Sequence, residues 1–382
     1  MKKFRIKDVL TISFSHLAHD IYSSFLAPML PLLIDKVGMS LSEAGFLDIA
    51  RRLPSLFNPL FGLMAEKKGV KYFVILTPAT TAIAMGLVGL VNSYILLLLL
   101  LFAAGLSAAL YHIPSPVMIK EASGDKTGRG MSFFMVGGES ARTIGPLIIT
   151  AAITHWGLEG SYRLIPFGVL ASFLLYLRLR NFEFHKDFSK KREKGDIKEF
   201  FRKYTGFFSL IGGFILFQSM MKSSLVLYMP VYLVQKGATL WEAGISLSVL
   251  QFFGILGTMF SGSYSDKIGR VNMLFISTTI SAVFMFLFVQ YGSVFLFPIL
   301  AVLGFFLFAS GPVLMASVQD LNSSMPTFAN SMYMTVNFGV SSIAVFSLGM
   351  LGDRYGLTFM YNIAIVCAFL CLVFIYFLGK KQ

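Results

Sequence analysis

Twelve apolar stretches dominate the sequence, and each is close to the length of a membrane-crossing helix, which needs about 20 residues. They lie roughly at 9–33, 41–64, 72–91, 94–118, 130–154, 160–178, 206–231, 240–264, 271–290, 293–318, 329–350 and 357–378. Inside lipid a chain must satisfy its backbone hydrogen bonds internally, so such stretches form helices. We therefore predict an all-α membrane protein with twelve transmembrane helices.

The composition agrees with this prediction and argues against a nucleic-acid-binding protein. Hydrophobic residues make up 56% of the 382 residues and charged residues only 13%, whereas soluble proteins contain about 25% charged residues. The net charge of +13 is not gathered in a soluble domain, so it does not indicate a nucleic-acid partner. We expect the lipid bilayer to be the main surroundings of the chain.

The basic residues have a topological explanation instead. Most of the 32 Lys and Arg residues precede the first predicted helix, follow the even-numbered helices or end the chain. Short cytoplasmic loops carry such an excess. The sequence therefore predicts a multi-pass protein of the inner (plasma) membrane with both termini in the cytoplasm.

One long polar stretch, RNFEFHKDFSKKREKGDIKEFFRKY at 180–204, separates six predicted helices from the next six. This stretch is charged and too short to bury a core of its own. We therefore predict a six-helix bundle at 1–179, a cytoplasmic linker at 180–204 and a second six-helix bundle at 205–382.

A short loop pattern recurs at matching places in the two halves. GLMAEKKGVK follows the second helix and GSYSDKIGRV follows the eighth, and both contain a glycine, an acid four residues later and a glycine three residues after that. GMLGDRYG repeats the pattern after the eleventh helix. After the fifth helix, TAAITHWG keeps only the last glycine, Gly157. Recurrence every three helices indicates inverted three-helix repeats within each half.

These loops resemble the signature loop of the major facilitator superfamily, and the layout of twelve helices is similar to that family over essentially the entire chain. The resemblance implies transport by alternating access and, by default, a monomer. In that family the loop is a conformational latch, which the resemblance assigns to Gly62, Glu66, Gly69, Gly262, Asp266 and Gly269.

A narrower resemblance involves SHLAHD in the first helix and YHIPSPVMIKEASGDKTGRGMSFFMVGGESARTIGPL at 111–147. These segments look like the bacterial fosmidomycin resistance proteins, which are drug-efflux members of the superfamily. The resemblance implies export and antibiotic resistance. The sequence departs from that group at Glu139 and Arg142, where uncharged residues are expected.

Several predicted helices carry a polar stripe on one face. Asp48, Arg51 and Arg52 share a face of the second helix, although each charge costs about 2.5–3.5 kcal/mol at the membrane centre. Two interpretations remain open: the charges pair within their own helix, or an arginine binds an anionic substrate, which suits guanidinium. The candidate substrate-binding residues are Arg51, Arg52, His112, Arg142, Gln218 and Lys222.

The acidic residues in the stripes are candidates for proton coupling, because burial favours the neutral form of a carboxylate and allows it to load and release a proton. Asp20 and Glu139 are the strongest candidates, and Asp48, His16 and His19 are further ones. Asp20 has an alternative, purely structural role as the hydrogen-bond partner of His16 one turn earlier.

The sequence contains no phosphate-binding glycine loop, paired-histidine zinc motif or nucleophile elbow, so we expect neither an enzyme nor a cofactor. The leading hypothesis is a proton-coupled antiporter that exports a small anionic or amphiphilic drug such as fosmidomycin. A second hypothesis is transport of an organic anion or of a divalent metal ion by His16, His19 and Asp20, although no resident metal is expected. A third is a non-transporting membrane sensor.

Overall fold

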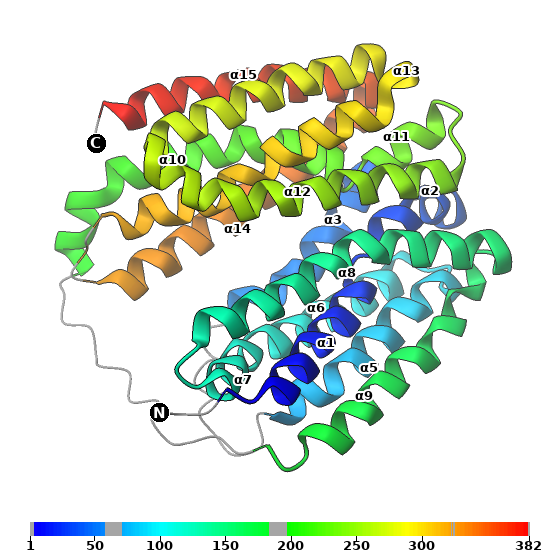
Figure 1. The fold of residues 1–382 in the computed structure, drawn as a ribbon. Helices are drawn as coiled ribbons and strands as arrows, with labels where there is room; N and C mark the ends of the chain where they lie inside the picture. Colours follow the sequence, from blue (N-terminus) through cyan, green and yellow to red (C-terminus); the bar gives the residue numbers. More distant parts are fainter. Residues whose placement is uncertain (1–3, 58–70, 183–196, 322, 324, 381–382) are drawn as a thin grey trace. The chain divides into compact units, whose positions relative to one another are not determined.

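The computed structural model describes residues 4–57, 71–182, 197–321, 323 and 325–380, and nearly all of them lie in helices (Figure 1). The helices of the first part of the chain are α1 (Ile6–Ser23), α2 (Leu26–Val37), α3 (Leu41–Arg52), α5 (Lys71–Leu87), α6 (Tyr94–His112), α7 (Pro114–Ser123), α8 (Thr127–Trp156) and α9 (Ile165–Leu179). Three short 3-10 helices accompany them, namely η1 (Leu53–Phe57), η2 (Val88–Leu90) and η3 (Glu159–Leu164). The later helices are α10 (Ile197–Val226), α11 (Met229–Gln235), α12 (Leu240–Ile268), α13 (Arg270–Gln319), α14 (Pro326–Tyr355) and α15 (Leu357–Gly379).

Within the described residues, ten helical stretches are long and apolar enough to cross a membrane. The predicted span at 41–64 begins with α3 but continues into residues 58–70, which lie outside the description. The predicted span at 130–154 is covered by α8, which has 30 residues but carries Glu139 and Arg142. The multi-span membrane protein is therefore confirmed, whereas the count of twelve helices and the inverted repeats stay predictions.

Prolines explain where two of the spans break. A proline has no N–H to donate to the carbonyl four residues earlier. Pro28 removes the bond to Ser24, which directly follows α1, and Pro230 removes the bond to Val226, the last residue of α10. Both breaks divide one apolar stretch into a long helix and a shorter one.

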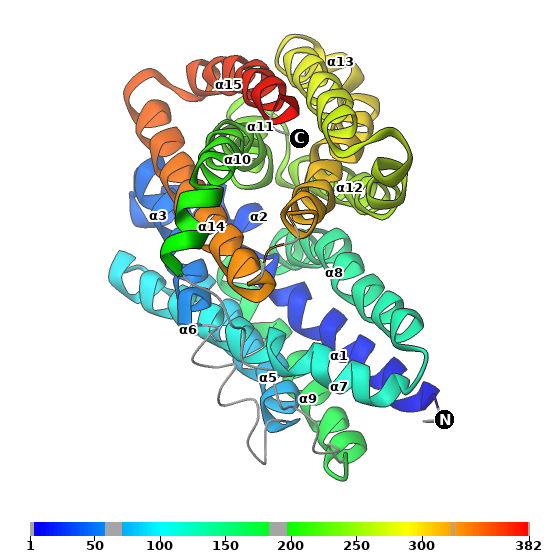
Figure 2. The same ribbon diagram turned by 90° about the vertical axis from the view of Figure 1, so that its left-hand side faces the viewer.

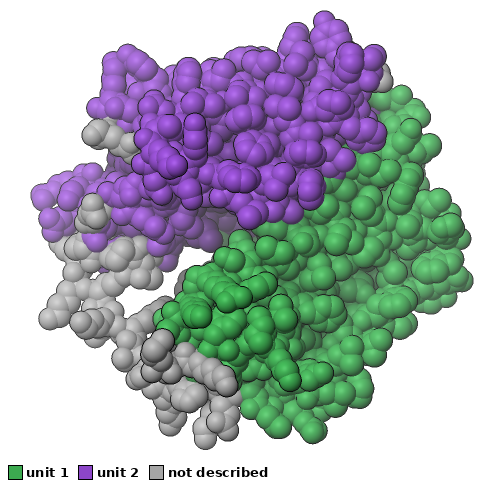
Figure 3. Space-filling model, viewed as in Figure 1, with its two compact units in different colours: residues 1–39, 46–189, 233–248 green, residues 40–45, 190–232, 249–382 purple. Residues whose placement is uncertain are grey.

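The chain forms two compact units, shown in different colours in Figure 3. Unit 1 comprises Met1–Met39, Phe46–Ser189 and Leu233–Ser248, and unit 2 comprises Ser40–Gly45, Lys190–Tyr232 and Val249–Gln382. Unit 1 thus includes a short segment from the second half of the sequence, Leu233–Ser248, and unit 2 includes a short segment from the first half, Ser40–Gly45. The domain boundaries at 179 and 204 predicted from the sequence stay a prediction.

In unit 1, α1 packs along α8 and also contacts α5, α7 and α9. Figure 2 shows α1 beside α7 and α8. The apolar core of this unit includes Ile12 of α1, Ile75 of α5, Tyr111 of α6 and Met118 of α7, all of them fully buried. This packing fixes α1 between its neighbours, and α1 carries the polar stripe of the first predicted helix.

In unit 2, α10 packs against α14 and α15, and α15 also packs against α13. Phe214 of α10 and Cys371 of α15 are fully buried in the core of this unit. The carboxylate of Asp353, near the end of α14, accepts the N–H groups of Leu41 and Ser42 at 2.6 and 3.0 Å. It thereby caps the first turn of α3, whose N–H groups have no partner within the helix.

Candidate functional site

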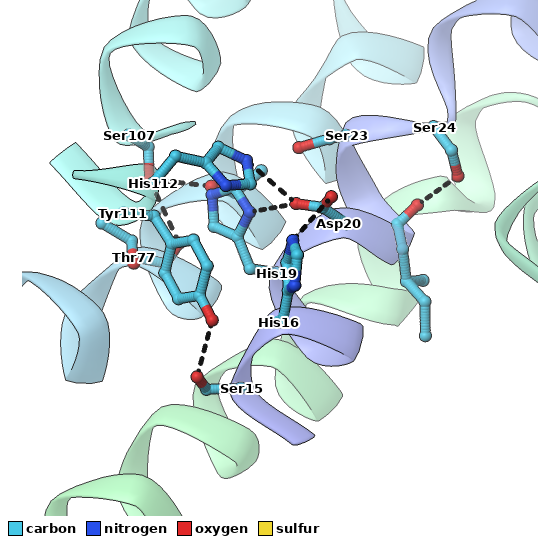
Figure 4. A network of polar contacts seen from close by, with 12 residues as sticks. Ser15, His16, His19, Asp20, Ser23, Ser24, Thr77, Ser107, Tyr111 and His112 are labelled. Carbon is cyan, nitrogen blue, oxygen red and sulfur yellow. Dashed lines mark hydrogen bonds and ion pairs between the residues drawn. The ribbon is translucent and has the colours of Figure 1, made fainter. Parts of the chain in front are cut away.

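Unit 1 contains a buried carboxylate that is surrounded by three imidazoles (Figure 4). The Nδ1 atom of His19 lies 2.8 Å from Oδ1 of Asp20. The Nε2 atoms of His16 and His112 lie 3.3 Å from Oδ2 and Oδ1 of Asp20, respectively. His16, His19 and Asp20 come from α1, as the predicted polar stripe implies, and His112 is the last residue of α6. We call these four residues the histidine cluster.

The fit of His16 against α8 depends on Gly138. A Cβ atom at Gly138 would lie 2.3 Å from Cε1 of His16 and 2.4 Å from Nε2, which is far inside ordinary contact distance. The Nδ1 atom of His16 lies 2.8 Å from the carbonyl oxygen of Phe134, and the two rings stack with centroids 4.0 Å apart. Since a carbonyl oxygen only accepts hydrogen bonds, Nδ1 carries the hydrogen. In the neutral imidazole, Nε2 then presents a lone pair toward Asp20.

Tyr111 supports the other side of the histidine cluster. Its ring stacks on His19 with centroids 4.5 Å apart, and its hydroxyl lies 2.7 Å from the hydroxyl of Ser15. His112 follows directly, and its side chain is 41% exposed while that of Asp20 is 7% exposed. Within the histidine cluster, His16, His19 and Asp20 are therefore buried, whereas His112 is partly exposed.

A second charged group lies at the end of α3, where Asp48 pairs with both arginines. The Nη2 atom of Arg51 lies 2.7 Å from Oδ1 of Asp48, and the Nη2 atom of Arg52 lies 2.7 Å from Oδ2. The side chain of Asp48 is 3% exposed, whereas that of Arg52 is 42% exposed. The ion pairs within the helix are thus present, yet a single carboxylate pairs with two guanidinium groups. A net positive charge remains.

Close packing against α6 sets the position of this arginine pair. A Cβ atom at Gly105 of α6 would lie 1.8 Å from the carbonyl oxygen of Arg51, so a larger residue cannot occupy that position without moving α3. The Nη1 atom of Arg51 lies 3.5 Å from the carbonyl oxygen of Ser23. Ser23 is the last residue of α1, one turn beyond His19 and Asp20.

The third charged group belongs to α8, where the Nη1 atom of Arg142 lies 3.0 and 3.2 Å from the two carboxylate oxygens of Glu139. This is the pairing at helical spacing that the sequence suggested as one alternative. The side chains of Glu139 and Arg142 are 17% and 45% exposed. Among the three acids considered for proton coupling, Glu139 is therefore more accessible than Asp20 or Asp48.

The two candidates from the later part of the chain have partners inside unit 2. The amide nitrogen of Gln218 donates to the hydroxyl of Ser310, and the Nζ atom of Lys222 lies 4.5 Å from the ring centroid of Phe308. Ser310 and Phe308 lie in α13, and the sequence predicted neither of them as a site residue. The role of Gln218 and Lys222 in substrate binding stays a prediction.

Half of the residues assigned to the conformational latch can be described. Gly62, Glu66 and Gly69 fall within 58–70 and lie outside the described residues. Gly269 has φ +92° and directly precedes α13. Oδ1 of Asp266 lies 2.5 Å from Nη1 of Arg270, while no described atom lies within 4 Å of a Cβ built at Gly262. The latch assignment itself stays a prediction.

Comparison with known families identifies the chain. The model of the Major Facilitator Superfamily matches residues 12–345. The chain is 26% identical over 371 residues to the fosmidomycin resistance protein of Escherichia coli strain K12, with 95% of this chain and 89% of that protein covered. It is also 22% identical over 297 residues to the multi-drug resistance efflux pump PmrA of Streptococcus pneumoniae, with 74% and 73% of the two chains covered.

Solved structures share the fold at lower sequence identity. A bacterial homologue of the human lysosomal transporter Spinster, in an inward-facing and unoccupied conformation, superposes with a TM-score of 0.83 at 14% identity. The match covers 100% of this chain and 98% of that one. A D-xylose–proton symporter superposes with a TM-score of 0.75 at 14% identity, with 98% of both chains covered. These likenesses show the fold.

Proposed function

The chain belongs to the major facilitator superfamily, and from this membership we propose that it exports a small anionic or amphiphilic compound, such as fosmidomycin, in exchange for protons. Members of the family are membrane transporters and not enzymes, as the sequence analysis expected. The direction of transport and the kind of substrate are supported by the names of two relatives, a fosmidomycin resistance protein and a multi-drug efflux pump.

The observation that carries the anionic substrate is the pairing of one carboxylate with two arginines in α3. Asp48 contacts Arg51 and Arg52 at 2.7 Å each, so this group keeps a net positive charge inside a membrane protein. Ionisable residues at such positions are costly and mark functional sites by default. A phosphonate or carboxylate can accept two parallel hydrogen bonds from a guanidinium group. Arg52 is the more exposed of the two arginines and offers its guanidinium more readily.

For the proton, we propose Glu139 of α8 as the carrier. The side chain of Glu139 is 17% exposed and therefore exchanges protons with water more readily than a fully buried acid. Protonation removes its charge and weakens its pairing with Arg142, so loading and release of the proton change the net charge of this pair. Asp48 is bound to two guanidinium groups, and the oxygens of Asp20 are shared among three imidazoles.

The membrane, the orientation and the oligomeric state of the transporter also belong to the proposal. We place the protein in the inner (plasma) membrane as a monomer with both termini in the cytoplasm, because most of its basic residues occupy the loops of one predicted side. The transport cycle is alternating access, as in the family, and it draws on the proton gradient.

Equilibrium binding tests the substrate part of the proposal directly. Fosmidomycin is titrated into the purified protein in detergent and into two variants, Arg52→Gln and Arg163→Gln. Arg163 serves as the control because it lies outside the polar groups, 5.4 Å from the ring of Trp156. We expect Arg52→Gln to weaken binding at least tenfold, about 1.4 kcal/mol, and Arg163→Gln to bind like the wild type. Equal binding by Arg52→Gln, or equal binding of an uncharged phosphonate diester, would contradict the proposal.

A further inference from the structure

We propose that His16, Asp20 and His112 form a binding site for a divalent transition-metal ion of the zinc class. One ligand atom from each of these residues lies within 4.8 Å of the others, and imidazole nitrogen and carboxylate oxygen are ordinary zinc ligands. The site belongs to α1 and α6 of unit 1 alone. The inference goes beyond the export of a drug and does not depend on it, because binding of the ion requires no transported compound.

The spacing of the ligand atoms favours an ion over direct hydrogen bonds. The Nε2 atom of His16 lies 3.3 Å from Oδ2 of Asp20, and the Nε2 atom of His112 lies 3.3 Å from Oδ1, the other oxygen of the same carboxylate. Two tetrahedral ligands at about 2.0–2.2 Å from zinc lie about 3.3–3.6 Å from each other. A hydrogen bond between charged nitrogen and oxygen is shorter, about 2.7–2.9 Å. His19 shows that shorter spacing, at 2.8 Å from Asp20, and therefore acts as a hydrogen-bond partner.

The buried side of the site presents an unpartnered nitrogen. His16 is 5% exposed, and within the described part of the chain its Nε2 has no hydrogen-bond partner. Its Nδ1 donates to the carbonyl of Phe134, so in the neutral imidazole Nε2 points a lone pair at the carboxylate of Asp20. Two acceptors in that arrangement repel each other unless a proton or a metal ion lies between them. Metal-binding histidines typically have this arrangement, with the other ring nitrogen bonded to a carbonyl or carboxylate.

Neighbouring residues hold the ligands in position. His19 fixes one oxygen of Asp20 and is itself stacked on Tyr111, so both are positioning residues and neither is a ligand. Such outer partners orient the ligands of metal sites. The sequence suggested a partial metal site made of His16, His19 and Asp20. The structure places His112 on the carboxylate as well, which supplies a ligand from a second helix.

The exposed side of the site leaves room for the ion to enter. The side chain of His112 is 41% exposed and His112 is the last residue of α6, so this ligand lies on the accessible side of the site. With three ligands from the protein, a fourth position remains for water. Open positions of this kind are typical of sites that exchange their ligands rather than of closed structural sites.

Direct metal titration tests the proposal without any transported compound. Zn²⁺ is titrated into the purified full-length protein in detergent by calorimetry, and Co²⁺ is used in parallel because its visible absorption reports tetrahedral ligands. We expect one ion per chain and at least tenfold weaker binding by Asp20→Asn and by His112→Ala. His155→Ala is the matched control, since His155 is exposed near the end of α8, and it should bind like the wild type.

Two results would overturn the metal site. One is wild-type protein without stoichiometric binding of Zn²⁺ or Co²⁺, which would mean that a proton alone occupies the gap between His16 and Asp20. The other is unchanged affinity in folded Asp20→Asn and His112→Ala variants, which would place the ion elsewhere. Metal binding without fosmidomycin binding would refute the proposed substrate and leave the metal site intact, and the opposite result would refute only the metal site.

Discussion

Replacing Gly138 with alanine tests whether the contact between α8 and the ring of His16 is as close as the structure places it. The added methyl group would lie 2.3 Å from Cε1 and 2.4 Å from Nε2 of His16. The ring cannot turn away freely, because it is stacked on Phe134 and hydrogen-bonded to the carbonyl of the same residue. Either the imidazole or α8 must therefore shift by about 1 Å to restore ordinary contact in a closely packed interior.

The expected change in stability of Gly138→Ala follows from two opposing contributions to the free energy of unfolding. Adding a methyl group to a packed interior costs about 1–3 kcal/mol, while replacing glycine by alanine in the middle of a helix gains about 0.5–1 kcal/mol. Gly339→Ala in the middle of α14 is the matched control, because among the described residues no atom beyond its chain neighbours and the adjacent backbone of α14 lies within 4 Å of its Cβ position. The helix contribution is the same in both variants. Gly138→Ala should therefore be less stable than Gly339→Ala by about 1–3 kcal/mol.

The assay is denaturant titration of both purified variants in detergent micelles, followed by tryptophan fluorescence or circular dichroism. A second measurement, the affinity for Zn²⁺, should fall in Gly138→Ala and stay unchanged in Gly339→Ala, because only the former displaces His16. Equal stability and equal metal affinity of the two variants would refute the close packing of His16 on α8.

Three further changes have calculable effects. Asp48→Asn removes the carboxylate from two guanidinium groups that are 24% and 42% exposed, and loss of hydrogen bonds to a charged group lowers the free energy of unfolding by about 1.5–3 kcal/mol. A variant as stable as the wild type in denaturant titration would contradict the pairing. Asp353→Ala removes the cap of α3 and should cost about 0.5–2 kcal/mol, and hydrogen exchange at the Leu41 amide should accelerate. Glu159→Gln removes an ion pair in which Oε1 of Glu159 lies 2.7 Å from Nζ of Lys36, and the side chain of Glu159 is 61% exposed. The free energy of unfolding of this variant, measured in the same denaturant titration, should therefore differ from that of the wild type by less than about 1 kcal/mol.

Much of the architecture could be predicted from the sequence, because its causes are local. The length of the apolar stretches predicted membrane-crossing helices. The spacing of three and four residues between Asp48 and the two arginines made ion pairs within α3 one of two open interpretations, and the structure contains both pairs. Similarly, the interval of four residues between His16 and Asp20 placed them on one face of α1, where they meet.

Contacts that depend on packing between distant helices could not be predicted in this way. His112 was assigned to substrate binding, since nothing in its own helix shows that α6 brings it to Asp20. The need for glycine at position 138 comes from a histidine ring on another helix, which the residues around Gly138 do not reveal. The capping of α3 by Asp353 joins residues more than three hundred positions apart, which no local pattern reveals.

Flux in proteoliposomes tests the central claim, coupled export of an anionic compound, most directly. Protein is reconstituted with an imposed pH gradient, and the movement of fosmidomycin and of protons is recorded for the wild type and for Glu139→Gln, with Arg163→Gln as the control. The account predicts fosmidomycin movement against its gradient with protons moving in the opposite direction, abolished by a protonophore and by Glu139→Gln but retained in Arg163→Gln. Fosmidomycin movement that is independent of the pH gradient, or no movement at all by the folded wild-type protein, would contradict it.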